Sequence, residues 1–121
     1  MARLLVAEDY DDFRELLADY LRARGHDVIE ARNGAEAIEA ARLEHPDAIV
    51  MDLMMPVRDG ASATRELKAS SATRGIPVVA VTAAAPRGVP AQEICPGCDA
   101  LVSKPVDFGT LLGTLATLLR S

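Results

Sequence analysis

Short apolar runs alternate along this chain with segments in which apolar residues recur at helical spacing. The runs are expected to be buried strands, because continuous apolar stretches that end at turn-forming or charged residues are typical of strands covered on both faces. Five strands are predicted, at residues 4–7, 27–31, 47–52, 76–82 and 99–103.

The clearest helix is predicted directly after the first strand. Acidic residues precede it, Arg22 and Gly25 mark its end, and its apolar residues recur at i, i+3, i+4, i+7 and i+8. This stripe consists of Phe13, Leu16, Leu17, Tyr20 and Leu21. Further helices are predicted at 35–44, at 60–70 and after Asp107, whose side chain can cap a leucine-rich helix.

Prolines interrupt the stretch between the fourth and fifth strands. Pro86, Pro90 and Pro96 each lack an amide hydrogen, and proline clashes with the preceding turn of a helix. The alanines at 83–85 could begin a helix, but only residues 91–95 are free to continue as one. We therefore expect any fourth helix to be short and labile.

Strands that alternate with helices at this spacing imply right-handed βαβ units. The predicted fold class is therefore α/β, a doubly wound parallel sheet with helices on both faces. No linker, repeat or low-complexity tract divides the chain, so residues 1–121 are expected to form one domain. In such sheets a ligand site lies beyond the carboxyl ends of the strands.

Composition narrows the possible partners and location. The net charge is −5 and no basic block occurs, which argues against nucleic acid as a direct partner. After Arg3 the N-terminus has only four apolar residues before it becomes acidic, too few for a signal peptide or a membrane span. We therefore expect a cytoplasmic protein without membrane insertion.

Polar residues close four of the predicted strands. Glu8 and Asp9 follow the first strand, and Asp52, Thr82 and Lys104 close the third, fourth and fifth. Carboxylates that converge at one edge repel each other unless a hard divalent cation such as magnesium neutralises them. A lysine and a hydroxyl suit the oxygens of a transferring phosphoryl group, which leaves Asp52 as the natural nucleophile.

These residues and their order resemble the receiver domain of response regulators, the phosphoacceptor module of two-component signalling. The resemblance covers essentially the whole chain and depends on Glu8-Asp9, Asp52, Met54-Met55-Pro56, Asp59-Gly60, Val81-Thr82-Ala83 and Lys104-Pro105. The separations between the second acid, the central aspartate, the threonine and the lysine are 43, 30 and 22 residues, similar to those of single-domain chemotaxis receivers. The resemblance implies a flavodoxin-like sheet with the strand order 2-1-3-4-5.

The resemblance also implies a phosphoryl-transfer site with a magnesium cofactor. Asp52 would accept a phosphoryl group from a phosphohistidine on a sensor histidine kinase or a histidine phosphotransfer protein. Asp9 and Asp52 would bind Mg²⁺ directly, Glu8 mainly through water, and the backbone carbonyl of Met54 would complete the protein ligands. Such a protein is a signalling switch that promotes only its own phosphorylation and dephosphorylation, and a downstream target protein reads the change.

Lys104 would hold one phosphoryl oxygen, and Thr82 would move to bind another, which is the switching motion. Two features depart from the family pattern. Leu101 stands where receivers often have a tyrosine or phenylalanine that turns inward with the threonine, so the coupled aromatic is absent or replaced. The proline-rich segment at 86–96 also breaks the fourth helix, and we expect this segment to be mobile until phosphorylation or a partner orders it.

The residues that flank the predicted site are apolar. Met54 and Ala84 offer no polar group that could position an attacking water. We therefore expect slow self-dephosphorylation.

Cys95 and Cys98 form a C-x-x-C pair that phosphoryl transfer does not require. The spacing would suit a redox pair or half of a zinc site, but no second cysteine or histidine pair is present and the motif does not open a helix after a strand. Two cysteines cannot form a disulfide framework, and they are compatible with a reducing compartment.

Two other functions compete with the receiver interpretation. A haloacid-dehalogenase-like phosphatase also uses an aspartate nucleophile and magnesium, but that family has a second acid two residues after the nucleophile, where this chain has Met54. A binding-only pseudo-receiver or a flavodoxin-like module would carry a loop rich in Ser, Thr and Gly after the first strand, where this chain has residues 8–12, Glu-Asp-Tyr-Asp-Asp.

Overall fold

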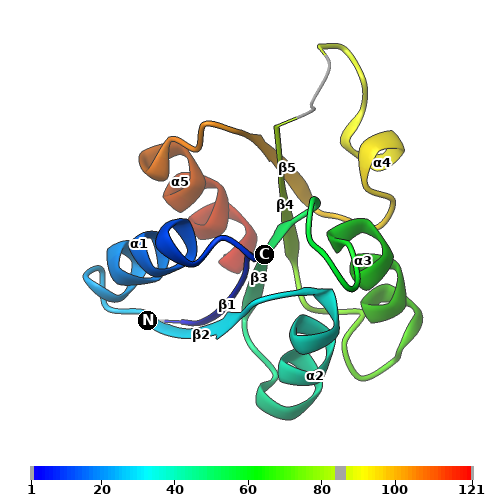
Figure 1. Cartoon of the computed structure of the whole chain (residues 1–121), viewed down its shortest axis with the longest axis horizontal. Coiled ribbons are helices and arrows are strands. Elements are labelled where there is room, and N and C mark those ends of the chain that lie inside the picture. Colours follow the sequence, from blue (N-terminus) through cyan, green and yellow to red (C-terminus); the bar gives the residue numbers. More distant parts are fainter. Residues whose placement is uncertain (1, 84–86, 121) are drawn as a thin grey trace.

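One five-stranded parallel sheet forms the centre of the molecule (Figure 1). The computed structural model describes residues 2–83 and 87–120. The strand order is β2-β1-β3-β4-β5 and every neighbouring pair is parallel, which confirms the predicted doubly wound sheet and its order. The strands are β1 (Arg3–Ala7), β2 (Asp27–Ala31), β3 (Ala48–Asp52), β4 (Val78–Thr82) and β5 (Ala100–Ser103).

Aspartates shorten two of the predicted strands at their starts. Asp47 accepts the backbone N–H of Arg3 at 2.8 Å, and Asp99 accepts that of Val78 at 2.7 Å. Each carboxylate therefore caps the first residue of the neighbouring strand, and β3 and β5 begin one residue later than predicted. The fourth strand begins after Pro77, which has no amide hydrogen to offer the sheet.

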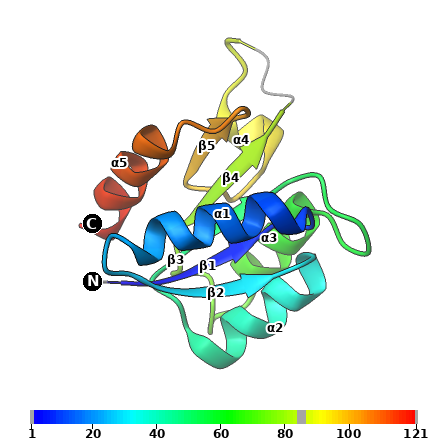
Figure 2. The same ribbon diagram turned by 60° about the vertical axis from the view of Figure 1, so that its left-hand side comes forward.

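Helices cover both faces of the sheet, as predicted. Helices α1 and α5 pack on one face, and α2, α3 and the short α4 lie on the other (Figures 1 and 2). Their bounds are α1 (Asp11–Arg22), α2 (Gly34–Glu44), α3 (Gly60–Ala69), α4 (Ala91–Ile94) and α5 (Phe108–Leu119). Asp107 caps α5 as predicted, because its carboxylate accepts the N–H of Gly109. Within the described residues, no helix is long and apolar enough to cross a membrane.

The buried stripe of α1 differs from the predicted one. Leu17 and Leu21 are buried, but Leu16 is 59% exposed, so its predicted place in the core is wrong. The inward positions of the helix are 14, 17, 18 and 21, and Arg14 occupies the first of them. The buried stripe therefore includes a charged residue, which a prediction from hydrophobicity alone does not place there.

The fourth helix is as short as the prolines predicted. It spans Ala91–Ile94 and none of its residues is buried. From residue 87 to residue 99, only the side chains of Cys95 and Cys98 are fully buried, where they join the core between the sheet and α3. The predictions made for Ala84, Ala85 and Pro86 fall outside the described residues.

Candidate functional site

The polar residues that close the strands meet at the carboxyl edge of the sheet. Asp52 is the last residue of β3 and Thr82 the last of β4, while Glu8 and Lys104 directly follow β1 and β5. The parallel order places β1, β3, β4 and β5 side by side, so these residues share one edge. The strand ends that carry these residues in the sequence therefore meet at one edge of the fold.

Asp52 presents a buried carboxylate that is held from two directions. Only 3% of the residue is exposed. Its Oδ1 accepts the backbone N–H of Met54 at 3.1 Å, and its Oδ2 lies 3.1 Å from Nζ of Lys104. One carboxylate oxygen is thus fixed by the chain that follows β3, and the other by the lysine that follows β5.

The loop after Asp52 turns tightly over the end of its strand. The N–H of Leu53 donates to the Val81 carbonyl oxygen at 3.0 Å, which extends the pairing of β3 with β4 by one residue. The Leu53 carbonyl oxygen accepts the N–H of Gly60 at 3.2 Å. A Cβ atom at Gly60 would collide with the carbonyl oxygen of Asp52, so this close approach requires glycine. Asp59 caps α3 by accepting the N–H of Ser62.

Lys104 links two carboxylates. Its N–H donates to the Thr82 carbonyl oxygen at 2.9 Å, and its Nζ lies 3.4 Å from Glu8 as well as 3.1 Å from Asp52. Burial opposes the charge of the ammonium group, but the hydrogen bond and negative charge of Asp52, with those of Glu8, raise the pKa of Lys104 on balance. The amine therefore remains charged between its partners.

Glu8, Asp9 and Asp52 form a cluster in which one oxygen of each lies within 4.8 Å of the others. Glu8 and Asp52 are buried and Asp9 is exposed. Burial, together with a hydrogen bond to Asp52 and the negative charge of Asp52, raises the pKa of Glu8 to about 7. The hydrogen bond from the N–H of Tyr10 lowers this pKa in part. The cluster therefore carries more negative charge than Lys104 neutralises, and its oxygens could hold a hard divalent cation.

Thr82 and the Met54 segment border an apolar pocket beside Asp52. The pocket has a volume of about 640 Å³ and is also lined by Ile94 of α4. Thr82 itself is buried, and the side chain of Met54 is 70% exposed. The contribution of the Met54 carbonyl to a metal site and the movement of Thr82 stay predictions.

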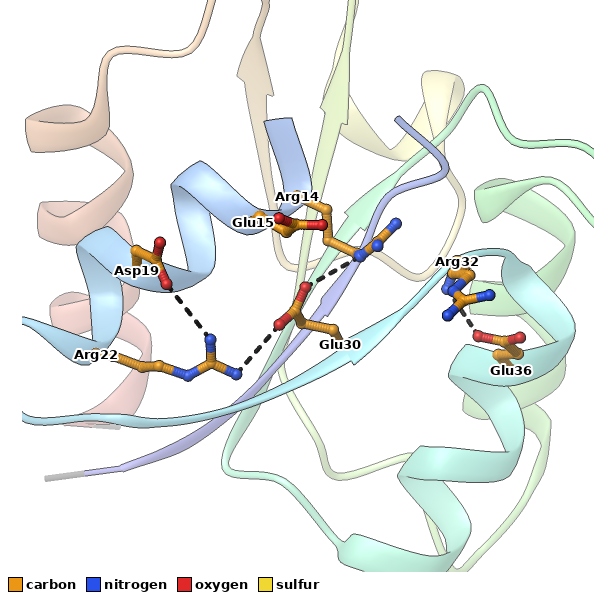
Figure 3. Close-up of a pocket in the computed structure, with 7 residues that line it drawn as sticks. All are labelled: Arg14, Glu15, Asp19, Arg22, Glu30, Arg32 and Glu36. Atoms are coloured by element: carbon orange, nitrogen blue, oxygen red, sulfur yellow. Dashed lines mark hydrogen bonds and ion pairs between the residues drawn. The ribbon is translucent and has the colours of Figure 1, made fainter. Parts of the chain in front are cut away.

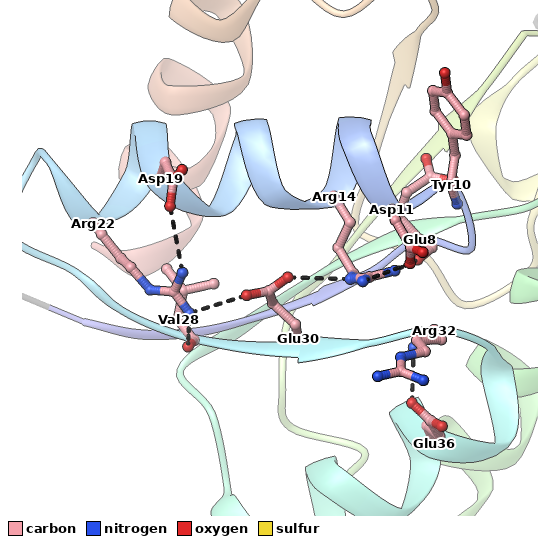
Figure 4. A network of polar contacts seen from close by, with 10 residues as sticks. All are labelled: Glu8, Tyr10, Asp11, Arg14, Asp19, Arg22, Val28, Glu30, Arg32 and Glu36. Atoms are coloured by element: carbon pink, nitrogen blue, oxygen red, sulfur yellow. Dashed lines mark hydrogen bonds and ion pairs between the residues drawn. The ribbon is translucent and has the colours of Figure 1, made fainter.

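Sequence reasoning missed Arg14. Its guanidinium contacts the Glu8 backbone, Glu30 and Asp11 (Figure 4). Asp11, in the first turn of α1, is therefore an ion-pair partner of Arg14. The position of Arg14 three and seven residues before Leu17 and Leu21, on the same helix face, was the feature that could have revealed it.

The cysteine pair has the character of packing residues. Both thiols are free and buried. Burial, followed by the charge of Cys95 and a hydrogen bond with it, raises the pKa of Cys98 to about 11. A thiol that stays protonated in an apolar environment is a poor nucleophile and a poor metal ligand, so the raised pKa of Cys98 argues against a redox or zinc role for the pair.

Comparison with known proteins identifies the class. The family model of the response regulator receiver domain matches residues 4–116. The chain therefore belongs to this family, the receiver domains of two-component systems. This membership favours the receiver interpretation over the haloacid-dehalogenase-like phosphatase.

Relatives and solved structures agree with this assignment. The polar-differentiation response regulator DivK of Brucella ovis is 36% identical over 116 residues, which cover 96% of this chain and 94% of DivK. A receiver domain of a Francisella response regulator has a TM-score of 0.90 and 25% identity, and the match covers 99% of this chain and 98% of the other. The receiver domain of a Pseudomonas aeruginosa sensor histidine kinase, solved with magnesium coordinated in its active-site cleft, has a TM-score of 0.89 and 31% identity, with coverage of 99% and 98%.

Proposed function

We propose that residues 1–121 form one receiver domain in which Asp52 is the phosphoacceptor of a two-component phosphorelay. The observation that carries this proposal is the buried Asp52 carboxylate, which lies 3.1 Å from the ammonium group of Lys104 beside the acidic pair. A nucleophile needs a fixed position and a nearby charge to receive the oxygens of the incoming group. The two contacts to Asp52 supply the first requirement, and Lys104 supplies part of the second.

The donor set fits a magnesium ion. Asp9 and Asp52 would bind it directly, Glu8 mainly through water, and the Met54 carbonyl would add a further oxygen. The fit is supported by the negative charge that a single lysine leaves unneutralised, and by the pKa of Glu8, which burial together with Asp52 raises to about 7. A bound Mg²⁺ supplies positive charge to the phosphoryl oxygens and lowers the repulsion between them and the carboxylates.

The protein residues would carry the transfer itself. An Asp52 oxygen attacks phosphorus, the bond from phosphorus to the donor histidine nitrogen breaks, and the products are an aspartyl phosphate and a free imidazole. Lys104 would exchange its contact with Asp52 for a contact with one phosphoryl oxygen. The Thr82 hydroxyl would donate a hydrogen bond to a second phosphoryl oxygen. The reaction changes only the receiver and its donor, so the domain is a switch with self-directed chemistry.

A docking face for the donor adjoins the site. Tyr10 and Leu16 are large apolar side chains that are 64% and 59% exposed. They border an apolar hollow of about 430 Å³ that extends to Lys104 and Phe108. A phosphohistidine can reach Asp52 only if its carrier rests against this edge, so this face suits a sensor histidine kinase or a histidine phosphotransfer protein. Such donors place the domain in the cytoplasm.

The output would start at Thr82 and pass to α4. Thr82 and Ile94 line the same apolar pocket, so a movement of the threonine changes the surroundings of the fourth helix. Leu101 packs against the same core cluster as Ile94 and takes the place of the expected aromatic. A downstream target protein would recognise this change although no aromatic side chain at position 101 turns inward.

The test is phosphorylation by acetyl phosphate with magnesium, followed by intact mass. Wild-type protein is expected to gain one phosphoryl group, and Asp52→Asn none. Asp59→Asn is the matched control, because Asp59 is an aspartate only seven positions further along the chain and caps α3. An adduct that persists in Asp52→Asn would move the acceptor elsewhere, and a wild-type protein that gains no adduct would favour the binding-only alternative.

A further inference from the structure

Arg14 is a buried cation next to the acidic pair. It lies in the first turn of α1, and only 5% of the residue is exposed. Its Nη1 donates to the Glu8 carbonyl oxygen at 3.0 Å, its Nε donates to Glu30 at 3.1 Å, and its Nη2 lies 2.7 Å from Asp11 (Figure 4). A charge this far from water is stable only where partners replace its hydration, and here all three nitrogens are engaged.

The contact with Glu8 fixes the chain where it leaves the sheet. The N–H of Glu8 donates to the Ala31 carbonyl oxygen on β2 at 3.0 Å, so the residue is held on its amino side by the sheet. Its carbonyl oxygen is held by Arg14. That carbonyl belongs to the peptide unit that joins Glu8 to Asp9, so Arg14 sets the plane from which Asp9 projects.

Arg14 acts through geometry more than through its charge. Asp11 and Glu30 both pair with the guanidinium and neutralise it. Burial is the main cause of the raised pKa of Glu8, followed by the hydrogen bond and the charge of Asp52. The consequence of losing Arg14 is therefore a displaced peptide and not a change in the charge of the cluster.

We propose that Arg14 is a positioning residue for the divalent-cation site: it holds the Glu8–Asp9 peptide so that both carboxylates face Asp52. This inference rests on the proposed function, in which the acidic cluster binds Mg²⁺. Lysine cannot replace the three contacts, because an ammonium group is a point charge and lacks the planar fork of a guanidinium.

The same charged network provides a control. Arg22, one of the residues of a groove of about 630 Å³ beside α1 and β2, contacts the other oxygen of Glu30 at 3.2 Å (Figure 3). It also donates to the Val28 carbonyl oxygen at 3.0 Å, and it lies 3.6 Å from Asp19. Arg22 thus shares a partner and a helix with Arg14, but its bonds are to Glu30, Val28 and Asp19 and not to the Glu8 carbonyl.

The experiment is calorimetric titration of the unphosphorylated protein with MgCl₂, which needs no phosphodonor. Arg14→Lys is expected to bind Mg²⁺ about tenfold more weakly than wild type, the size typical of lost outer-shell contacts, and Arg22→Lys within about twofold of wild type. Arg14→Met, which removes the donor and the buried charge together, serves as a second variant and carries the same expectation. Thermal melting of each variant confirms that it is folded at the titration temperature.

Phosphorylation by acetyl phosphate gives the second readout. In Arg14→Lys the magnesium concentration for half-maximal rate should rise by about the same tenfold factor, while the rate at saturating magnesium stays close to that of wild type. Unchanged Mg²⁺ affinity in both Arg14 variants, or an equal loss in Arg22→Lys, would overturn the inference. A wild-type protein that binds no Mg²⁺ would instead overturn the proposed cation site, so the two failures are distinguishable.

Discussion

Replacement of Glu8 by glutamine should change the pH dependence of stability when no metal is present. The pKa of Glu8 is raised from 4.5 to about 7 because the carboxylate is buried next to Asp52. Below pH 4.5 the Glu8 carboxyl group is protonated in both the native and the unfolded chain, and its contribution to the free energy of unfolding is fully present. As the pH rises through 7 the native carboxylate must ionise in its buried position, and the contribution is lost.

The size of the effect follows from the shift. At about 1.4 kcal/mol for each unit of pKa, the rise at Glu8 corresponds to about 3 kcal/mol of stability lost between acidic and mildly alkaline pH. Glu8→Gln keeps the shape and removes the titration, so it should be more stable than wild type at pH 8 by about that amount, or roughly 10 °C in Tm. At pH 5 the two proteins should unfold nearly alike.

The assay is urea unfolding from pH 5 to pH 8.5 in EDTA, repeated in excess MgCl₂. Magnesium should stabilise wild type at pH 8 more than it stabilises Glu8→Gln, because the cation offsets a repulsion that the variant lacks. If the free energies of unfolding of wild type and variant differ by the same amount at every pH of this range in EDTA, the reasoning about Glu8 is refuted.

Three further predictions concern the lysine, the lifetime of the phosphoryl group and the fourth helix. Lys104→Met should slow phosphorylation by acetyl phosphate by about 10² to 10³, the scale typical of a lost oxyanion donor, and a rate within threefold of wild type would contradict the role of the amine. The phosphoryl group on Asp52 should persist for minutes or longer with magnesium present, since the exposed thioether of Met54 cannot orient a water; a half-life of seconds would count against this. Amides from 91 to 95 should exchange quickly in the unmodified protein and slow after phosphorylation, whereas strong and unchanged protection would show that α4 is not the responsive element.

The sequence predicted the sheet well because β1, β3, β4 and β5 are apolar runs with a polar residue at or directly after the carboxyl end. That pattern depends only on local residue order, and the parallel topology then places Asp52, Thr82 and Lys104 at the same edge. The starts of β3 and β5 were less predictable, because the caps by Asp47 and Asp99 depend on amides from neighbouring strands.

The surroundings of the site could not be predicted in the same way. On α1 the buried position belongs to Arg14 and the exposed one to Leu16, because the Arg14 guanidinium is held by the Glu8 carbonyl, Glu30 and Asp11. Of these partners Glu30 comes from β2, 16 residues further along the chain, and its proximity to Arg14 is a property of the folded chain. The raised pKa of Glu8 likewise depends on burial and on Asp52, which is 44 residues away in the sequence.

The most direct test of Asp52 as the acceptor is chemical mapping of the modified residue. Protein treated with acetyl phosphate and magnesium is reduced with borohydride, which converts an aspartyl phosphate to homoserine, then digested and sequenced by mass spectrometry. Homoserine at position 52 and at no other aspartate is the predicted result. Homoserine at Asp9 or Asp59, or unmodified aspartate at position 52 in protein that has gained a phosphoryl group, would contradict it.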